Sequence, residues 1–208
     1  MTTPLEVTFE LAPWRSALSR ALHRNRAQPF CRFLQLATVR SDGSPANRTV
    51  VFRGFLESSN RLMFISDRRS EKIDQLHQEP QTPNRTPFNA EICWYFTKTR
   101  EQFRISGQLS SIDASHSEVS LIAARQHLWQ RISDSARLQF AWPHPKDVRT
   151  KDSNFEPSAP DSQMPPATFC MLLLTPLNVD YLSLSGEPQD RINYSYQDAD
   201  WPRQVVNP

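Results

Sequence analysis

Alternating apolar and polar positions recur along this chain and predict β-strands more often than helices. The clearest case is Arg48–Phe55, where Val50 and Phe52 fall on one face and Thr49 and Arg53 fall on the other. Side chains of a strand point alternately to its two faces, so this period of two is typical of a half-buried strand. We therefore read this stretch as one strand of a sheet.

Similar segments follow one another along most of the chain. The expected strands are Arg32–Val39, Pro45–Phe55, Leu62–Ile65, Glu91–Phe96, Gln102–Ile112, Thr168–Thr175, Val179–Leu184, Arg191–Tyr196 and Trp201–Val206. No regular alternation of strand and helix links them, which argues against a parallel sheet. The pattern predicts a mainly β protein with peripheral helices, in which six to eight antiparallel strands form a barrel.

Three segments have helical spacing instead. In Pro13–Arg26 the apolar positions, beginning at Trp14, recur every three or four residues, and proline suits the first helical position. A second helix is expected over Glu71–Glu79, before a proline-broken loop at Gln81–Pro87. The third is expected over Ser115–Arg131; its cap would be Asp113 or Ser115, and its partial apolar stripe would be Val119, Ile122, Ala123 and Leu128.

The composition suits one domain with an irregular insertion. A chain of 208 residues is long enough for a sizeable core, yet its hydrophobic content of 38% and mean hydropathy of −0.59 are low for a compact monomer. Six prolines lie within Pro143–Pro166, among many charges and few apolar residues. We expect a single domain over residues 1–208 that contains an irregular excursion at about 143–166.

Charge and cysteine content exclude several classes of protein. The net charge of +2 argues against a dedicated nucleic-acid binder. The three cysteines are far apart and form no paired motif, which favours reduced thiols over disulfides. The longest wholly apolar run, Phe169–Leu174, has six residues, too few to span a membrane. We expect a cytoplasmic protein that binds neither nucleic acid nor membrane.

The stretch Asn47–Lys72 is the best candidate for chemistry. It holds six basic and three acidic side chains, a surplus of three positive charges, and hydroxyls at Ser66 and Ser70 flank the expected start of a helix. Arginine, lysine and free helix N–H groups are the donors that bind phosphate. From this pattern alone, the alternative is a hairpin whose arginines simply face water.

Three motifs in this region and beyond it resemble one family. They are R-x-V-V-F-R-G-F at Arg48–Phe55, M-F-I-S-x-x-x-S-x-K at Met63–Lys72 and R-x-Q-F-R-I-S-G at Arg100–Gly107. In order and spacing they resemble the pyridoxine/pyridoxamine 5′-phosphate oxidase family, whose members are flavin mononucleotide (FMN) proteins built on a split β-barrel. The resemblance extends from about Arg32 to Pro208.

The resemblance implies a set of FMN contacts. Arg48 and Lys72 match cations that contact the FMN phosphate, and Ser70 could join them. The positions matching residues along or near the flavin ring are Thr49, Val50, Val51, Ile65 and Ser66 on the first two motifs, together with Arg53, Gln102 and Arg191. In the family, the residue at the position of Gln102 often reaches the flavin from the partner subunit.

The resemblance to the vitamin B6 oxidases is less complete at the substrate side. Arg53, His127, Arg131 and Ser135 match positions that bind the substrate phosphate, although His127 replaces a tyrosine. Glu71 stands in place of an arginine, Leu182 replaces a tryptophan that packs on the flavin, and Glu187-Pro188-Gln189 replaces an Arg-x-His that holds the substrate. Loss of these donors favours retention of flavin over oxidation of vitamin B6.

We therefore expect an FMN-binding flavoprotein, an oxidoreductase related to pyridoxamine 5′-phosphate oxidase but with a different substrate. The alternatives are a genuine pyridoxamine/pyridoxine 5′-phosphate oxidase and a non-catalytic flavin carrier or sensor. The sequence holds no recognisable catalytic motif or clustered metal ligands, which fits a protein whose cofactor carries the reactive chemistry. No catalytic residue or metal ligand is assigned, and the other partner would be a small-molecule electron donor or substrate.

A homodimer with FMN at its interface is also expected. A lone barrel would expose a face carrying Trp94, Phe96 and Phe103, which a two-fold contact would bury on both subunits. The alternative is a monomer in which Pro143–Pro166 folds back over that face.

Overall fold

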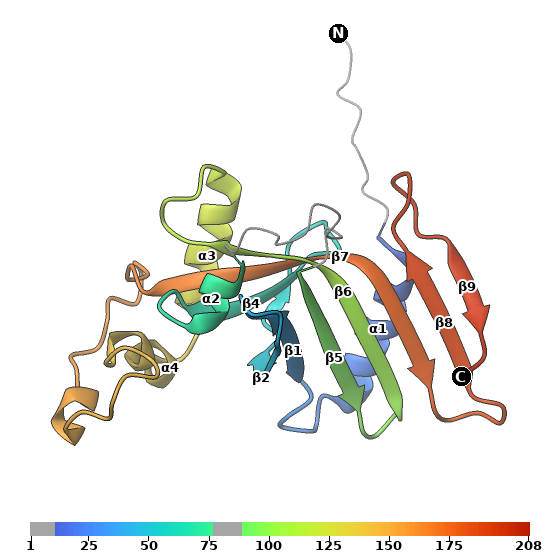
Figure 1. The fold of residues 1–208 in the computed structure, drawn as a ribbon, viewed down its shortest axis with the longest axis horizontal. Coiled ribbons are helices and arrows are strands. Elements are labelled where there is room, and N and C mark those ends of the chain that lie inside the picture. The colour runs from blue at the N-terminus through green and yellow to red at the C-terminus, as the bar shows by residue number, and fades with distance from the viewer. Residues whose placement is uncertain (1–10, 77–88) are drawn as a thin grey trace, which may run out of the picture.

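The computed structural model describes residues 11–76 and 89–208 (Figure 1). The last residues of the expected Glu71–Glu79 helix and the expected loop at Gln81–Pro87 lie outside these ranges. In the described part of the chain no helix is long and apolar enough to cross a membrane.

Antiparallel strands form one curled sheet, as the alternation predicts (Figure 1). The strands are β1 Phe33–Val39, β2 Pro45–Val51, β3 Gly54–Phe55, β4 Leu62–Asp67, β5 Ala90–Phe96, β6 Glu101–Ile112, β7 Phe169–Ser183, β8 Asp190–Ser195 and β9 Arg203–Val206. The sheet runs in the order β2-β1-β5-β6-β7-β4-β3, and the β8–β9 hairpin extends it from β7. The mainly β fold with peripheral helices is confirmed, with seven strands in the curled half-barrel and two in the hairpin.

The helices lie around this sheet. They are α1 Pro13–Asn25, α2 Glu71–Leu76, α3 Val119–Arg131 and α4 Asp134–Leu138, with 3-10 turns η1 Gln139–Ala141 and η2 Asp152–Phe155. Figure 1 shows α1 beside β5 and β6, and α3 and α4 at the far end of the long strands. The expected helix at Pro13–Arg26 is thus confirmed to within one residue.

The strand expected over Pro45–Phe55 is two strands joined at a corner. β2 ends at Val51. The Phe52 N–H still donates to Arg32, which directly precedes β1, whereas the Arg53 N–H donates to Met63 on β4. Gly54 follows with φ of 136°, a conformation that favours glycine. The alternation continues through this corner, so the period could not reveal that the chain moves from one neighbour to another.

The two strands expected on either side of Pro176 are one continuous strand. Gly107 pairs with Pro176 and Ser106 pairs with Asn178, so β7 carries one extra residue in a bulge. A bulge tolerates a proline because one ladder hydrogen bond is already interrupted there. Gly107 is required at this point, since a Cβ atom would lie 2.0 Å from the carbonyl oxygen of Thr175.

The third helix differs from its prediction in start and in orientation. Asp113 accepts hydrogen bonds from the backbone and hydroxyl of Ser115, which forms a turn, and the helix begins only at Val119. The expected apolar stripe is wrong at Val119, which is 77% exposed, and at Ala123, which is also exposed, whereas Leu128 is buried as expected. The buried face instead carries Leu121, Arg125, Leu128 and Trp129. Arg125 donates to the carbonyl oxygen of Phe169, so a charged residue occupies the centre of the buried face.

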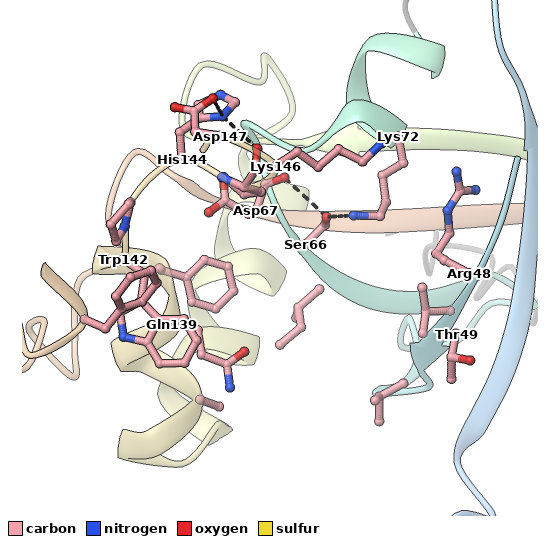
Figure 2. Close-up of a pocket in the computed structure, with 18 of the residues that line it drawn as sticks. Arg48, Thr49, Ser66, Asp67, Lys72, Gln139, Trp142, His144, Lys146 and Asp147 are labelled. Carbon is pink, nitrogen blue, oxygen red and sulfur yellow. Dashed lines mark hydrogen bonds and ion pairs between the residues drawn. The ribbon is translucent and has the colours of Figure 1, made fainter. Parts of the chain in front are cut away.

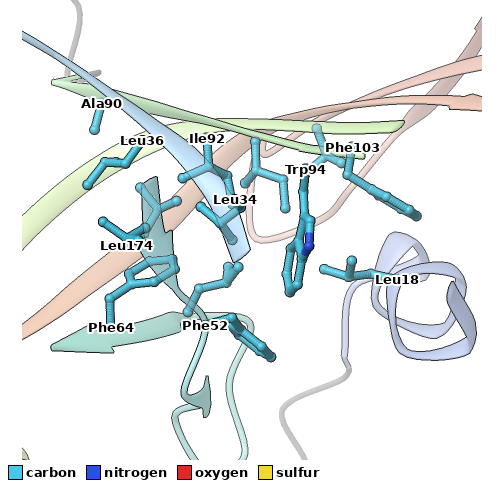
Figure 3. Close-up of a cluster of buried hydrophobic side chains, with 14 of the residues drawn as sticks. Leu18, Leu34, Leu36, Phe52, Phe64, Ala90, Ile92, Trp94, Phe103 and Leu174 are labelled. Carbon is cyan, nitrogen blue, oxygen red and sulfur yellow. The ribbon is translucent and has the colours of Figure 1, made fainter. Parts of the chain in front are cut away.

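Two apolar clusters pack on opposite faces of the sheet. The larger cluster lies under α1 and includes Trp94, Phe96 and Phe103, all at most 1% exposed (Figure 3). The smaller cluster joins α3 and η1 to the first half of β7. Phe169–Leu174 is therefore covered on both faces, which accounts for its uninterrupted apolar sequence.

This packing corrects the expectation that a lone chain exposes its aromatic face. Figure 3 shows Leu18 of α1 beside Trp94, and Phe52 also packs on the Trp94 ring at 5.0 Å between centroids. The chain's own helix covers these residues, and the Pro143–Pro166 excursion lies elsewhere. Apart from η2 the excursion contains no helix or strand, and the Trp129 indole N–H donates to its Asp161 carbonyl at 2.8 Å, which anchors it to α3.

Candidate functional site

A cleft of about 730 Å³ lies between the strand–turn–helix region of Asn47–Lys72 and the segment that follows α4 (Figure 2). β2, β4 and α2 supply one side through Arg48, Thr49, Val50, Val51, Arg53, Ile65, Ser66, Asp67 and Lys72. The opposite side consists of Ala136, Gln139, Phe140, the run Trp142–Thr150, and Phe155. Of the three sequence motifs, Arg48–Phe55 and Met63–Lys72 contribute residues to the cleft, and Arg100–Gly107 contributes none.

Lys72 lies at one end of the cleft among hydroxyl groups. Its Nζ donates to the Ser66 Oγ at 3.0 Å and to the Ser70 Oγ at 2.8 Å. Ser70 does not line the cleft, but its hydroxyl donates to the Asp67 carbonyl and so holds the lysine in place. Burial lowers the pKa of Lys72, and the nearby charge of Arg48 lowers it further.

Arg48 lies beside this end of the cleft, as Figure 2 shows. Its guanidinium donates to Thr38 Oγ1 at 2.6 Å, to Gln75 Oε1 at 3.0 Å and to the Leu36 carbonyl at 3.2 Å. Burial also lowers the pKa of Arg48. All three acceptors are neutral, so they orient the side chain without cancelling its charge.

Neither cation is paired with a carboxylate within 4.0 Å among the residues that the structure describes. Asp67, an acidic residue of the cleft wall, is paired with Arg69 at 2.7 Å and also accepts the Arg69 backbone N–H. Two partly desolvated positive charges beside hydroxyl donors form a site suited to a doubly charged phosphate.

The side walls of the cleft are less polar. Thr49 is exposed and Val51 is half-buried, whereas the Val50 side chain points into the core, so only its backbone can serve a ligand. Ile65 packs against the smaller core cluster on the same side. Phe140 and Trp142 line the opposite wall of the cleft. A flat, apolar ring system fits between such walls.

Gln102 and Arg191 do not line the cleft. In the strand register Gln102 pairs with Leu182, and Leu182 pairs with Arg191, so the three form one row across the sheet. Their neighbours Phe103 and Tyr181 point into the core, which places the row on the opposite, outer face. Arg191 pairs there with Asp180 at 2.7 Å. One chain therefore does not bring these two residues to the proposed flavin site.

The four residues matched to substrate phosphate are also dispersed. Arg53 lines the cleft, whereas His127 and Arg131 line a second groove of about 770 Å³ between α3 and the β3–β4 hairpin. Ser135 lines neither, and its hydroxyl lies 3.0 Å from that of Ser133 at the start of α4. The described residues include no group of histidine, cysteine and acidic side chains that could hold a metal ion.

Sequence reasoning missed the second wall of the cleft. His144 and Lys146 belong to the excursion that the proline content marked only as irregular, and Trp142 directly precedes it. A tryptophan followed at once by alternating proline and basic residues is an unusual opening for a solvated loop, and that composition is the only signal the sequence offers.

Comparisons with known proteins agree with these features. Residues 11–113 match the family model described as the FMN-binding domain of pyridoxamine 5′-phosphate oxidase. A protein of Arabidopsis thaliana named pyridoxine/pyridoxamine 5′-phosphate oxidase 2 is 36% identical over 204 residues, covering 95% of this chain and 98% of that protein.

Solved structures give the same result. A pyridoxamine 5′-phosphate oxidase-related, FMN-binding protein from Nostoc punctiforme is 53% identical with a TM-score of 0.88, covering 96% of this chain and 100% of the other. PhzG from Burkholderia lata, solved with tetrahydrophenazine-1-carboxylic acid, shares the fold at a TM-score of 0.74 and 19% identity, covering 100% of this chain and 98% of its own. This chain belongs to the pyridoxamine 5′-phosphate oxidase family of FMN-binding proteins.

Proposed function

We propose that the cleft binds FMN, with its phosphate between Arg48 and Lys72. The observation that carries this proposal is the pair of desolvated cations that no carboxylate neutralises in the described residues. The Ser66 hydroxyl lies at the same end of the cleft, and the walls at Val51, Ile65 and across from them suit the ring. A dianion at this end would offset the cost of holding both charges away from water.

We further propose that the protein is an oxidoreductase whose substrate is not a vitamin B6 phosphate. Bound FMN would supply the electron-transfer chemistry, and the chain would position the ring and exclude water from it. Arg53 is the one matched substrate-phosphate residue in the cleft; His127 and Arg131 face another groove. Glu187 and Gln189, which stand where donors are expected, line a separate hollow with Arg100.

Two rival functions have specific support. The 36% identity to a protein named as a pyridoxine/pyridoxamine 5′-phosphate oxidase favours the same reaction here. The dispersal of the matched substrate residues favours a flavin carrier or sensor without turnover. Both rivals retain the flavin site, so they differ from our proposal only in what reacts with the flavin.

We also propose a homodimer. The argument no longer rests on the aromatic face of Trp94, because α1 buries that face. The outer face of the sheet carries Phe33 and Tyr95, which are 48% and 45% exposed, beside the Gln102–Arg191 row. Phe33 pairs with Val51, which lines the cleft, so the cleft opens onto this same face. A two-fold partner packed on it would bury the apolar residues and could bring its own Gln102 and Arg191 to the cleft.

The test begins with the cofactor. Titration of flavin-free protein with FMN and with riboflavin should show a clear preference for FMN, and equal affinities would refute the phosphate assignment. Anaerobic addition of NADPH, pyridoxamine 5′-phosphate and a panel of other donors then separates the three functions by bleaching of the bound flavin. Rapid bleaching by pyridoxamine 5′-phosphate with steady turnover would favour the vitamin B6 oxidase, and no bleaching by any donor would favour the carrier.

A further inference from the structure

We propose that Lys146, on the excursion, is a positioning residue for the phosphate end of the cleft, acting on Arg48 through Glu71 and Gln75. This inference rests on the proposed function, because it concerns the same FMN site. It starts from the observation that the excursion is a wall of the cleft and not a solvated loop. Pro143, His144 and Lys146 all line it.

The excursion is tied to the opposite wall at its beginning. Arg69 donates from Nη2 to the Trp142 carbonyl at 3.1 Å, and Asp67 holds that guanidinium in place through two oxygens. The Phe155 ring, where the wall ends, packs edge-on against the Trp142 ring at 5.8 Å between centroids. The segment between these rings therefore has a defined position beside α2.

The second tie is the ion pair between the Lys146 ammonium and Oε2 of Glu71. Figure 2 shows the Lys146 side chain extending from the excursion toward α2. The other carboxylate oxygen of Glu71 accepts from Arg40 at 3.0 Å and from the Gln75 amide at 2.9 Å. Glu71 thus links the excursion, through Lys146, to Arg40 and to the buried Gln75.

Gln75 passes this arrangement on to the phosphate site. Its side chain is only 6% exposed, and once its amide nitrogen donates to Glu71, its oxygen is left as an acceptor. That oxygen accepts from Thr38 at 2.5 Å and from Nη2 of Arg48 at 3.0 Å. A continuous chain of polar contacts therefore runs from Lys146 to the guanidinium that would hold the phosphate.

The size of the effect follows from exposure. Lys146 is 73% exposed, and an exposed ion pair contributes little stability of its own, so removing it should weaken FMN binding only roughly two- to fivefold. The loss should be specific for the phosphate, because the contact chain ends on Arg48. Affinity for riboflavin, which lacks the phosphate, should stay nearly unchanged.

The experiment measures FMN and riboflavin affinities for the full chain, four single variants and one double variant. Lys146→Ala should lower the FMN-to-riboflavin preference roughly two- to fivefold, and Lys146→Arg should restore it. Lys151→Ala is the matched control, since Lys151 is an exposed lysine of the same excursion that does not line the cleft. In Glu71→Gln, a further Lys146→Ala change should have no additional effect on the preference.

The other outcomes have definite meanings. A further loss in the Glu71→Gln background would mean that Lys146 acts directly on the phosphate, and it would overturn the positioning role. Equal losses of affinity for FMN and riboflavin in Lys146→Ala would mean that the excursion acts only as a wall, which would overturn the positioning role. The same FMN-to-riboflavin preference in Lys146→Ala as in Lys151→Ala would also overturn it. A wild-type protein with no preference for FMN would overturn the proposed function itself, and this inference with it.

Discussion

Replacing Lys72 by methionine should weaken FMN binding while stabilising the flavin-free protein. The lysine is partly buried, and burial lowers its pKa, which means that the fold opposes its positive charge. Methionine has a similar length and no charge. Ser66 and Ser70 lose a donor but keep each other at 3.1 Å, so the substitution leaves no hydroxyl without a partner.

The two expected effects can be sized from these contacts. A charge-assisted hydrogen bond contributes about 1.5–3 kcal/mol, so FMN affinity should fall about 10- to 150-fold. The hydrogen bonds from Lys72 to the two serine hydroxyls replace part of its lost hydrogen bonding to water. Removing the buried charge should therefore stabilise the flavin-free fold by only about 1 kcal/mol. For a chain of 208 residues that corresponds to a rise of about 2–4 °C in melting temperature.

The pH dependence supplies an independent check on the same residue. Because the folded-state pKa of Lys72 is lowered from its ordinary value of 10.5, the unfolded chain binds more protons between the two values. The stability of the flavin-free protein should therefore gain a contribution that rises with pH across this window, and Lys72→Met should lose that contribution.

Isothermal titration with FMN and riboflavin, and thermal melts of flavin-free protein from neutral pH to pH 10.5, measure both effects. Lys98→Met is the control, since Lys98 is exposed on the β5–β6 turn. An equal loss of affinity for both flavins would show that Lys72 does not contact the phosphate. A lower melting temperature for the flavin-free variant would refute the reasoning about desolvation.

Three further predictions follow from other parts of the structure. Gly107→Ala should destabilise the fold by about 3 kcal/mol in urea unfolding, because a β7 carbonyl lies 2.0 Å from the added Cβ, whereas Gly43→Ala, with open space around it and φ of 82°, should cost about 1 kcal/mol. Burial raises the pKa of Cys170 to about 12, so its thiol should resist an aromatic disulfide reagent at about pH 8 until denaturant is added. Tyr95→Glu should reduce the mass in light scattering from twice 24.0 kDa to 24.0 kDa, while Met164→Glu, at an exposed apolar residue of the excursion, should not; a wild-type mass of 24.0 kDa would refute the dimer.

The sequence predicts the strands well because alternation is a local property. It fails where a tertiary contact decides the outcome. The period runs unbroken through Phe52 and Arg53, although their backbone groups bond to different strands. It also places Trp94 and Phe103 correctly on one face, but it cannot say that α1, rather than a second subunit, covers that face.

The site shows the same division. Arg48, Ser66 and Lys72 lie close together in the sequence, on β2, β4 and α2. A local sequence motif can therefore identify them. The opposite wall comes from a segment about seventy residues further along the chain. Its position depends on contacts such as Arg69 to the Trp142 carbonyl, which no local pattern encodes.

Gln102 and Arg191 match flavin contacts of the family in the sequence, yet a single chain does not place them at the cleft. The register puts them two strands apart in one row, on the face onto which the cleft opens, yet neither lines the cleft. A monomeric site would leave both matches without a role and would leave Phe33 and Tyr95 uncovered. A two-fold contact through this face accounts for both facts together, since the row of each subunit would face the cleft of the other. The distance of these residues from the cleft within one chain is therefore an argument for the dimer and not against the flavin site.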